Sequence, residues 1–343
     1  MIESLKLVSK AAQILIQDIL TRHHATGESV SVLIAQMARK RGLGPKERRF
    51  VSDQVFLKLR QKPWPDWFNQ RLKKQYGSGA KALEQALRTR AKPVLAVDIT
   101  QVTLETVETA LKEQDIDCAR SELSKTALLL SSDRLSSGVL KSCWWMDAGS
   151  QYVAQQIKAK PGERVLDLCA GAGGKTRLIA ATGADITAVD VNSKRLKLSC
   201  QQRLASSSMS RFILDASLHW HDNANPGKIS YQVADGRTLK LPLFDWILVD
   251  APCSGTGTLR HAPDLFGRLQ ESDLKNYTKL QHELLSNASK LLKPTGKLIY
   301  ATCSLLQEEN ISEFGGLKLI KSRQLLPSKE NCDGFWVAVF EHE

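Results

Sequence analysis

Hydrophobic runs that end in polar or small residues alternate with helical stretches from about residue 151 onward. The runs cover 164–168, 186–190, 229–234, 246–250 and 297–302. Helical periodicity occupies 174–182, 193–205 and 271–292. This alternation predicts an α/β fold with a mainly parallel sheet and helices on both faces. Ligands of such sheets bind at the carboxyl ends of the strands, so the residues that follow each run are the informative ones.

The pattern of residues 1–92 predicts helices, with Pro45 in the first turn of one of them. These residues also account for the whole net positive charge of the chain. They hold 19 Lys+Arg against 7 Asp+Glu, out of 48 and 36 in all, which leaves 29 of each for the rest. A basic module on a neutral body indicates docking of nucleic acid, although a solvated surface that favours solubility is the simpler alternative.

The region 93–145 combines strand-like and helical patterns and is predicted to be a small α+β unit. A strand is expected over 94–100, an amphipathic helix over 103–114 and a short strand over 128–130. The remainder, 146–343, forms the α/β part. A length of 343 residues is compatible with these three domains.

The seven cysteines are odd in number and widely spaced. Their pattern argues against a disulfide framework and against a zinc site, and we expect no metal. No apolar run reaches the ~18 residues of a membrane-spanning helix, and the first residues lack a signal-peptide pattern. We therefore expect a cytoplasmic protein with no membrane partner.

A glycine-rich turn follows the run 164–168 and opens a helix. It consists of Cys169, Ala170, Gly171, Ala172, Gly173, Gly174 and Lys175. Glycines let the backbone approach a ligand, and the helix start offers free N–H groups. The spacing of its glycines differs from that of a Walker-type phosphate loop, which excludes that reading.

Two aspartates end the next two strands. Asp190 is placed to bind ribose hydroxyls and Asp235 to contact an adenine edge, while Arg195 is a further candidate for the same site. These residues predict an adenosyl cofactor, but they leave nicotinamide and S-adenosylmethionine both open.

Two cysteines follow the last two strands in polar turns. Cys253 lies in Pro-Cys-Ser-Gly after Asp250, and Cys303 lies in Thr-Cys-Ser. Carbon 5 of a pyrimidine becomes nucleophilic when a thiolate adds to carbon 6, and a thiolate suits reversible addition. Asp250 is a candidate for contact with ring nitrogen 3. The two turns therefore favour S-adenosylmethionine over a nicotinamide cofactor. Their polar sequences also favour catalytic thiols over the simpler alternative that both cysteines are buried core residues.

These motifs resemble a known family. The glycine turn, Asp-Ala-Pro-Cys-Ser-Gly-Thr-Gly with the later Arg260 and Pro263-Asp264, and Ala-Thr-Cys-Ser with Glu308-Glu309-Asn310 are similar to the signatures of the RsmB/Nop2/Sun family of RNA 5-methylcytosine methyltransferases. The segment Lys46–Val51 resembles the NusB-like domain of its bacterial ribosomal RNA members, in a shortened form.

The resemblance implies a Rossmann-like S-adenosylmethionine methyltransferase domain at 146–343, with a helical NusB-like RNA-binding domain at 1–92 and a small α+β linker domain at 93–145. It implies that Cys303 attacks the base and that Cys253 helps release the product. It assigns the glycine turn, Asp190, Asp235 and Asp250 to the cofactor. Ribosomal RNA is the expected partner of a monomeric enzyme. A transfer-RNA methyltransferase and a non-catalytic ribosome-assembly protein are the alternatives.

Overall fold

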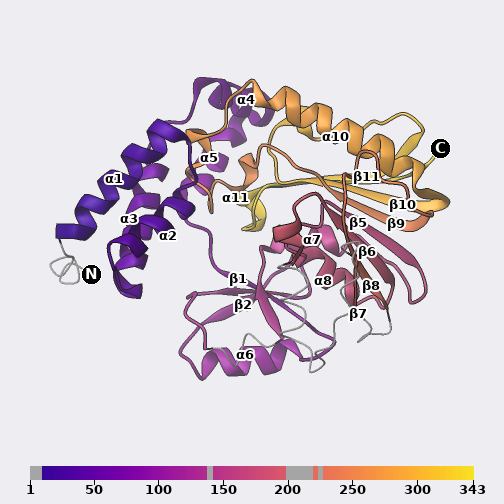
Figure 1. Ribbon diagram of the computed structural model, residues 1–343, viewed down its shortest axis with the longest axis horizontal. Coiled ribbons are helices and arrows are strands. Elements are labelled where there is room, and N and C mark those ends of the chain that lie inside the picture. Colours follow the sequence, from indigo (N-terminus) through magenta and orange to yellow (C-terminus); the bar gives the residue numbers. More distant parts are fainter. Residues whose placement is uncertain (1–9, 137–141, 198–218, 223–226) are drawn as a thin grey trace. The chain divides into compact units, whose positions relative to one another are not determined.

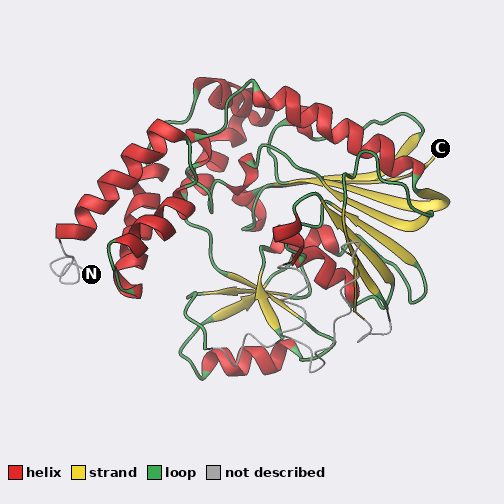
Figure 2. Ribbon diagram, in the orientation of Figure 1, coloured by secondary structure: helices red, strands yellow, loops and turns green. Residues whose placement is uncertain are grey.

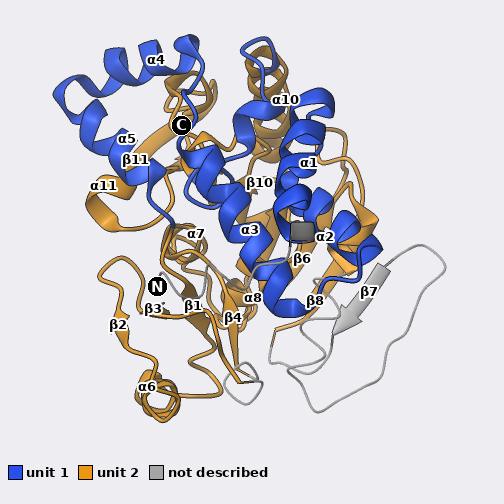
Figure 3. Cartoon of the chain, turned by 90° about the vertical axis from the view of Figure 1, so that its left-hand side faces the viewer, with its two compact units in different colours: residues 1–90, 258–273 blue, residues 91–257, 274–343 orange. Residues whose placement is uncertain are grey.

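The computed structural model describes residues 10–136, 142–197, 219–222 and 227–343. The chain forms two compact units (Figure 3). One comprises residues 1–90 with 258–273, and the other comprises 91–257 with 274–343. The predicted α/β domain at 146–343 includes residues 258–273. For that segment the prediction is wrong, because these residues pack within the helical unit.

The first unit is helical (Figure 2). Its helices are α1 (Lys10–Thr26), α2 (Val30–Lys40), α3 (Pro45–Arg60), α4 (Asp66–Tyr76) and α5 (Ala80–Arg88). Leu15, Leu33 and Val55, one from each of the first three helices, are fully buried in one core. Pro45 begins α3 as expected, and its fixed φ suits the first helical turn, where its missing N–H has no intrahelical partner.

Residues 258–273 are held in this unit by aromatic and polar contacts. The Phe266 ring lies 4.9 Å from that of Phe68 and 6.1 Å from that of Trp64. The Asp264 carboxylate accepts a hydrogen bond from the Val30 backbone N–H at 3.1 Å. A carboxylate at a helix start satisfies a free donor and complements the helix dipole, so this distant segment completes the first turn of α2.

The second unit begins with a small sheet. Its strands β1 (Val94–Val97), β2 (Cys118–Arg120), β3 (Ala127–Leu130) and β4 (Cys143–Trp145) are antiparallel in the order β2-β3-β1-β4. Helix α6 (Leu104–Lys112) buries Val107 and Leu111 in the same core as Leu95 and Leu128. The predicted strand 94–100 is shorter, ending at Val97, because Asp98 to Gln101 form a turn.

The large sheet has the order β11-β12-β10-β9-β5-β6-β8-β7 in the described chain (Figure 1). These strands are β5 (Arg164–Leu168), β6 (Asp185–Asp190), β7 (His219–Asp222), β8 (Ile229–Val233), β9 (Phe244–Asp250), β10 (Leu292–Thr302), β11 (Leu317–Leu325) and β12 (Phe335–His342). The five strands from β10 to β8 are parallel, and β7, β11 and β12 are antiparallel additions. The chain order reverses between β5 and β9, so a crevice is expected at their carboxyl ends.

Alternating side chains bury both faces of this sheet. On β9, Leu248 points to the face packed by α7 (Ala148–Ala154) and α8 (Gly174–Ala180), while Ile247 and Val249 point to the face packed by α10 (Asp273–Lys290). A strand buried on both faces is nearly continuously apolar. This explains why the four parallel strands β5, β6, β9 and β10 are recognisable as hydrophobic runs. The expected helix 193–205 extends beyond the described residues.

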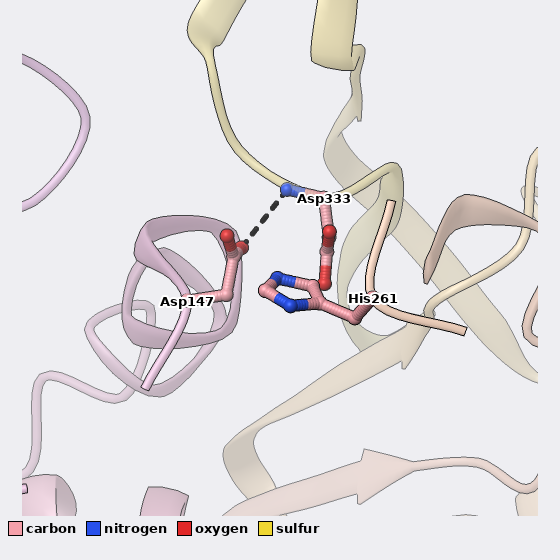
Figure 4. Close-up of side chains that lie close together, drawn as sticks. All are labelled: Asp147, His261 and Asp333. Atoms are coloured by element: carbon pink, nitrogen blue, oxygen red, sulfur yellow. Dashed lines mark hydrogen bonds between the residues drawn. The ribbon is translucent and has the colours of Figure 1, made fainter. Parts of the chain in front are cut away.

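Two polar residues at the start of the α/β part connect its pieces. Asp147 caps α7, accepting from the Gly149 N–H at 2.8 Å, and it also accepts from the Asp333 backbone N–H at 3.0 Å (Figure 4). The buried Gln151 donates to the Leu95 carbonyl of β1 at 3.2 Å. These bonds tie the small sheet and the loop before β12 to α7.

Within the described chain, no helix combines the length and apolar character that a membrane crossing requires.

Candidate active site

A cavity of about 590 Å³ opens at the carboxyl ends of β5, β6, β8, β9 and β10. Seven of the residues singled out from the sequence line it: Cys169, Asp190, Arg195, Asp235, Asp250, Cys253 and Cys303. The first residue of the glycine turn and the thiol pair thus line the same cavity, as expected for strand ends at a reversal of chain order. Residues 170–175 are outside its lining, but two of them bond directly to lining carboxylates.

The turn after β5 adopts backbone conformations that glycine favours. Gly171 has φ +58° and Gly173 has φ +76°, and Cys169 also lies in the left-handed region at +69°. A Cβ atom on Gly171 would lie 2.6 Å from the guanidinium of Arg195, so a larger residue would displace that side chain. Non-glycine residues in this region are strained and concentrate at functional sites.

Asp190 links the end of β6 to the glycine turn. Its carboxylate accepts from the Gly171 N–H at 2.8 Å and from the Asn192 N–H at 2.7 Å. It is 7% exposed and lines the cavity. The carboxylate is therefore fixed by two backbone donors beside the turn, with remaining acceptor capacity for a hydroxyl.

Asp235 follows the end of β8, and its carboxylate is hydrogen-bonded to Arg237. Both of its oxygens accept from Arg237, the shortest contact being 2.6 Å. These hydrogen bonds hold the pKa of Asp235 below its usual value. Opposite these polar groups, Leu280 and Leu284 of α10 supply an apolar wall that the sequence reading missed. Their spacing of four residues on an amphipathic helix was the available signal.

Lys175, the last residue of the glycine turn, pairs with Asp250 at the end of β9. Its ammonium nitrogen lies 2.7 Å from Asp250 Oδ2. Burial lowers the pKa of Lys175, but the charge of Asp250 and the hydrogen bond to it outweigh burial, so the net pKa lies above the ordinary value. The Lys175 side chain therefore stays positively charged and is hydrogen-bonded to Asp250.

The two cysteines of the polar turns lie side by side. Cys253 Sγ is 3.3 Å from Cys303 Sγ, within hydrogen-bond distance for sulfur, and both thiols are free. Their turns are also joined by the main chain, since the Gly257 N–H donates to the Cys303 carbonyl at 2.9 Å. A thiol pair at this distance offers one nucleophile and one proton-bearing partner.

The environment of Cys253 favours its protonated form. The hydrogen bond to Cys303, and then burial, raise the pKa of Cys253 well above the usual thiol range. Cys253 consequently keeps its proton at neutral pH and can donate it to the Cys303 sulfur. Because the thiolate is the reactive form of cysteine, this environment disfavours Cys253 as a nucleophile.

Asp167 on β5 is a buried acid that the sequence reading did not single out. Its Oδ2 accepts from the Thr176 hydroxyl at 2.5 Å, while its Oδ1 has no hydrogen-bond partner among the described residues. Burial raises its pKa to about 7. The only signal in the sequence was a charged residue inside an apolar strand.

We expect Asp167→Asn to remove a pH dependence of stability. The folded-state pKa is raised, so the stability that Asp167 contributes is complete below its unfolded pKa and declines as pH rises through about 7. Between pH 5 and 8 this change amounts to about 2 to 3 kcal/mol. Urea denaturation of the cofactor-free protein at both pH values measures it; equal pH slopes for wild type and Asp167→Asn would show that the assignment is wrong.

Comparison with known proteins gives consistent matches. Residues 154–315 match the family model described as 16S rRNA methyltransferase RsmB/F, and residues 64–134 match the model of its ferredoxin-like domain. Ribosomal RNA small subunit methyltransferase B of Pasteurella multocida is 31% identical over 350 residues, covering 92% of this chain and 75% of that protein. The protein of the same name from Enterobacter sp. is 31% identical over 294 residues. That match includes 80% of this chain but only 65% of the Enterobacter protein.

Solved structures share the fold. A methyltransferase homolog protein from Pyrococcus horikoshii superposes with a TM-score of 0.67 at 21% identity, over 88% of this chain and all of that one. NSun6 from the same organism, with SFG, gives a TM-score of 0.68 at 17% identity, over 81% of this chain and 98% of that one. These likenesses confirm the Rossmann-like methyltransferase fold.

The residues of the cavity fit S-adenosylmethionine, the cofactor of this type of methyltransferase. Asp190 offers a carboxylate for ribose hydroxyls, and Leu280 and Leu284 offer an apolar wall for a flat ring. Since the sequence matches extend over most of the chain and the fold agrees with them, the chain belongs to the RsmB/Nop2/Sun family of S-adenosylmethionine-dependent methyltransferases.

Proposed function

We propose that the protein methylates carbon 5 of cytosine in RNA, with small-subunit ribosomal RNA as its substrate. The observation that carries the proposal is the pair of thiols 3.3 Å apart in the cofactor cavity. Carbon 5 of cytosine is not nucleophilic in the aromatic ring, so its methylation requires prior addition to carbon 6. A methyltransferase that acted on an oxygen or an amine would need no thiol of this kind.

Cys303 is the proposed nucleophile. Its thiolate forms a bond to carbon 6, which turns carbon 5 into the nucleophilic end of an enamine. The cofactor supplies an electrophilic methyl group. Carbon 5 then gives up its proton to water, the electron pair reforms the ring double bond, and the Cys303 sulfur leaves carbon 6 as a thiolate. The protonated Cys253, beside this sulfur, is the proposed partner in release.

Asp250 is the proposed contact for ring nitrogen 3. Addition of a thiolate to carbon 6 places negative charge on the ring, which a proton taken up from water at nitrogen 3 neutralises, and the Asp250 carboxylate can accept a hydrogen bond from that N–H. Asp250 lines the cavity that holds both cysteines, and its ion pair with Lys175 fixes its orientation. The Lys175 ammonium also supplies positive charge close to the developing anion.

RNA binding is proposed for the basic helical unit, with a NusB-like role for residues 1–92. Basic residues around the turn between α2 and α3 are exposed, namely Arg39, Lys40, Arg41, Lys46 and Arg48. Contacts of this kind to phosphates make binding salt-dependent. The curated relatives are named for the small-subunit ribosomal RNA, which supports this substrate here. We propose that the protein acts as a monomer in the cytoplasm.

Bisulfite sequencing of total RNA tests this function. Cells that carry the gene should show one or more protected cytosines in small-subunit ribosomal RNA, and deletion should remove that protection. The purified protein with S-adenosylmethionine should restore it on RNA from the deletion strain. Loss of protection in transfer RNA alone would contradict the substrate, and unchanged protection throughout would contradict the activity.

A further inference from the structure

The two cysteine-bearing turns share one buried carboxylate. The Glu309 side chain is 0% exposed, and its Oε2 accepts from the hydroxyls of Ser254 and Ser304, each at 2.5 Å. Its Oε1 accepts from the Ser254 backbone N–H at 2.8 Å. Because these serines directly follow Cys253 and Cys303, a single side chain joins both turns within one residue of each thiol.

Further hydrogen bonds support this arrangement from α10 and from within the turns. Gln281 of α10 donates to Glu309 Oε1 at 3.1 Å and to the Pro252 carbonyl at 2.9 Å. Thr256 lies 3.2 Å from the Ser304 hydroxyl and accepts from the Leu305 N–H at 3.0 Å. The carboxylate is thus the centre of a network that reaches both neighbours of Cys253 and the serine that follows Cys303.

The composition of this network is unusual for a purely structural element. In the part of the chain that the structure describes, Glu309 has four neutral donors and no lysine or arginine partner. Burying a carboxylate costs free energy that hydrogen bonds only partly offset, and a neutral side chain would avoid the cost. The network surrounds the thiols, so a role there explains why a charge occupies this position.

We propose that Glu309 is a positioning residue for the thiol pair, whose carboxylate holds the two cysteine-bearing turns against each other. Its consequence for catalysis rests on the proposed function, whereas the geometry belongs to the folded chain alone. Glu309 also acts through its charge. After the larger effects of the Cys303 hydrogen bond, of burial and of the Cys303 charge, the negative charge of Glu309 contributes to the raised pKa of Cys253.

A first experiment measures the separation of the thiols without RNA or cofactor. Diamide takes two electrons and two protons from a pair of thiols and leaves a disulfide, at a rate that depends on how closely the sulfurs are held. The Glu309→Asp variant keeps the charge, but it is one methylene too short to reach both turns. We expect formation of the Cys253–Cys303 disulfide, quantified by peptide mass spectrometry, to slow by about tenfold or more. The adjacent exposed residue provides the control Glu308→Asp, which should keep the wild-type rate.

A second experiment isolates the charge. Glu309→Gln matches the carboxylate in size, and the two serine hydroxyls can turn to accept from its amide. Loss of the charge should lower the pH at which iodoacetamide alkylates the Cys253 peptide, whereas Glu308→Gln should leave that pH unchanged. A wild-type disulfide rate in a folded Glu309→Asp overturns the proposal, and an unchanged alkylation profile in Glu309→Gln overturns the contribution of the charge. If Glu309→Asp fails to fold, Ser304→Ala removes one of the two hydroxyl contacts of the carboxylate, and a wild-type disulfide rate in that variant overturns the proposal.

The catalytic arm separates this inference from the proposed function. In a methylation assay, Glu309→Asp should lower kcat and leave the KM for RNA close to that of wild type, because Glu309 is buried and does not line the cavity. If the wild-type protein does not methylate cytosine, the proposed function fails. The disulfide and alkylation results then still decide whether Glu309 positions the thiols.

Discussion

Cys303→Ala is expected to abolish methyl transfer to cytosine while the protein still folds and binds RNA. Removal of a covalent nucleophile costs a rate on the order of 10⁶-fold in well-studied enzymes. We do not expect Cys253 to substitute for it, because burial and the charge of Glu309, which this variant keeps, still raise the pKa of its thiol. The initial rate of methyl incorporation at saturating cofactor measures the loss, and filter binding at fixed salt measures RNA affinity.

A second cysteine outside the cavity provides the control for this substitution. Cys118→Ala changes a half-buried thiol on β2 of the small sheet and should leave the rate unchanged. Retention of more than about a tenth of the wild-type rate by Cys303→Ala would be incompatible with covalent catalysis by this residue. Loss of RNA binding together with the rate would instead indicate a folding defect.

Cys253→Ala is expected to trap the enzyme on its substrate. The Cys303 sulfur would still add to carbon 6 and methyl transfer would still follow, but the neighbouring thiol that assists release would be absent. A covalent protein–RNA adduct should therefore accumulate, visible as a shifted band on a denaturing gel with end-labelled RNA. We expect most of the enzyme in the adduct during a single incubation, where wild type shows little.

The double variant Cys253→Ala/Cys303→Ala provides the matched control, because it lacks the attacking sulfur and should form no adduct. If Cys253→Ala turned over at the wild-type rate without an adduct, Cys253 would have no part in release. If the double variant also formed an adduct, a residue other than Cys303 would be the nucleophile.

The central sheet was predictable from the sequence because four of its five parallel strands, β5, β6, β9 and β10, are buried on both faces. The run 164–168 and strand β5 coincide, and Asp250 and Cys303 lie where strand ends were expected. Strands β11 and β12 were not predicted. Most of β11 is exposed at the sheet edge, so its alternation of apolar and polar residues is weak.

Features that depend on distant contacts could not be read from local patterns. Phe266 packs against Phe68, about two hundred positions earlier in the chain, so nothing near Phe266 reveals its unit. Glu309 was recognisable only as part of a family motif, because the bonds that suggest its role reach Ser254, 55 positions away. The thiol separation likewise depends on the pairing of β9 with β10.

Locating the covalent bond tests the central claim most directly. The adduct formed by Cys253→Ala on cytosine-containing RNA can be digested with nuclease and protease and sequenced by tandem mass spectrometry. We predict that the modified nucleotide is attached to the Cys303 sulfur and carries the transferred methyl group. Attachment to any other residue, or an active protein that forms no bond to RNA in this variant or in wild type, would contradict the account.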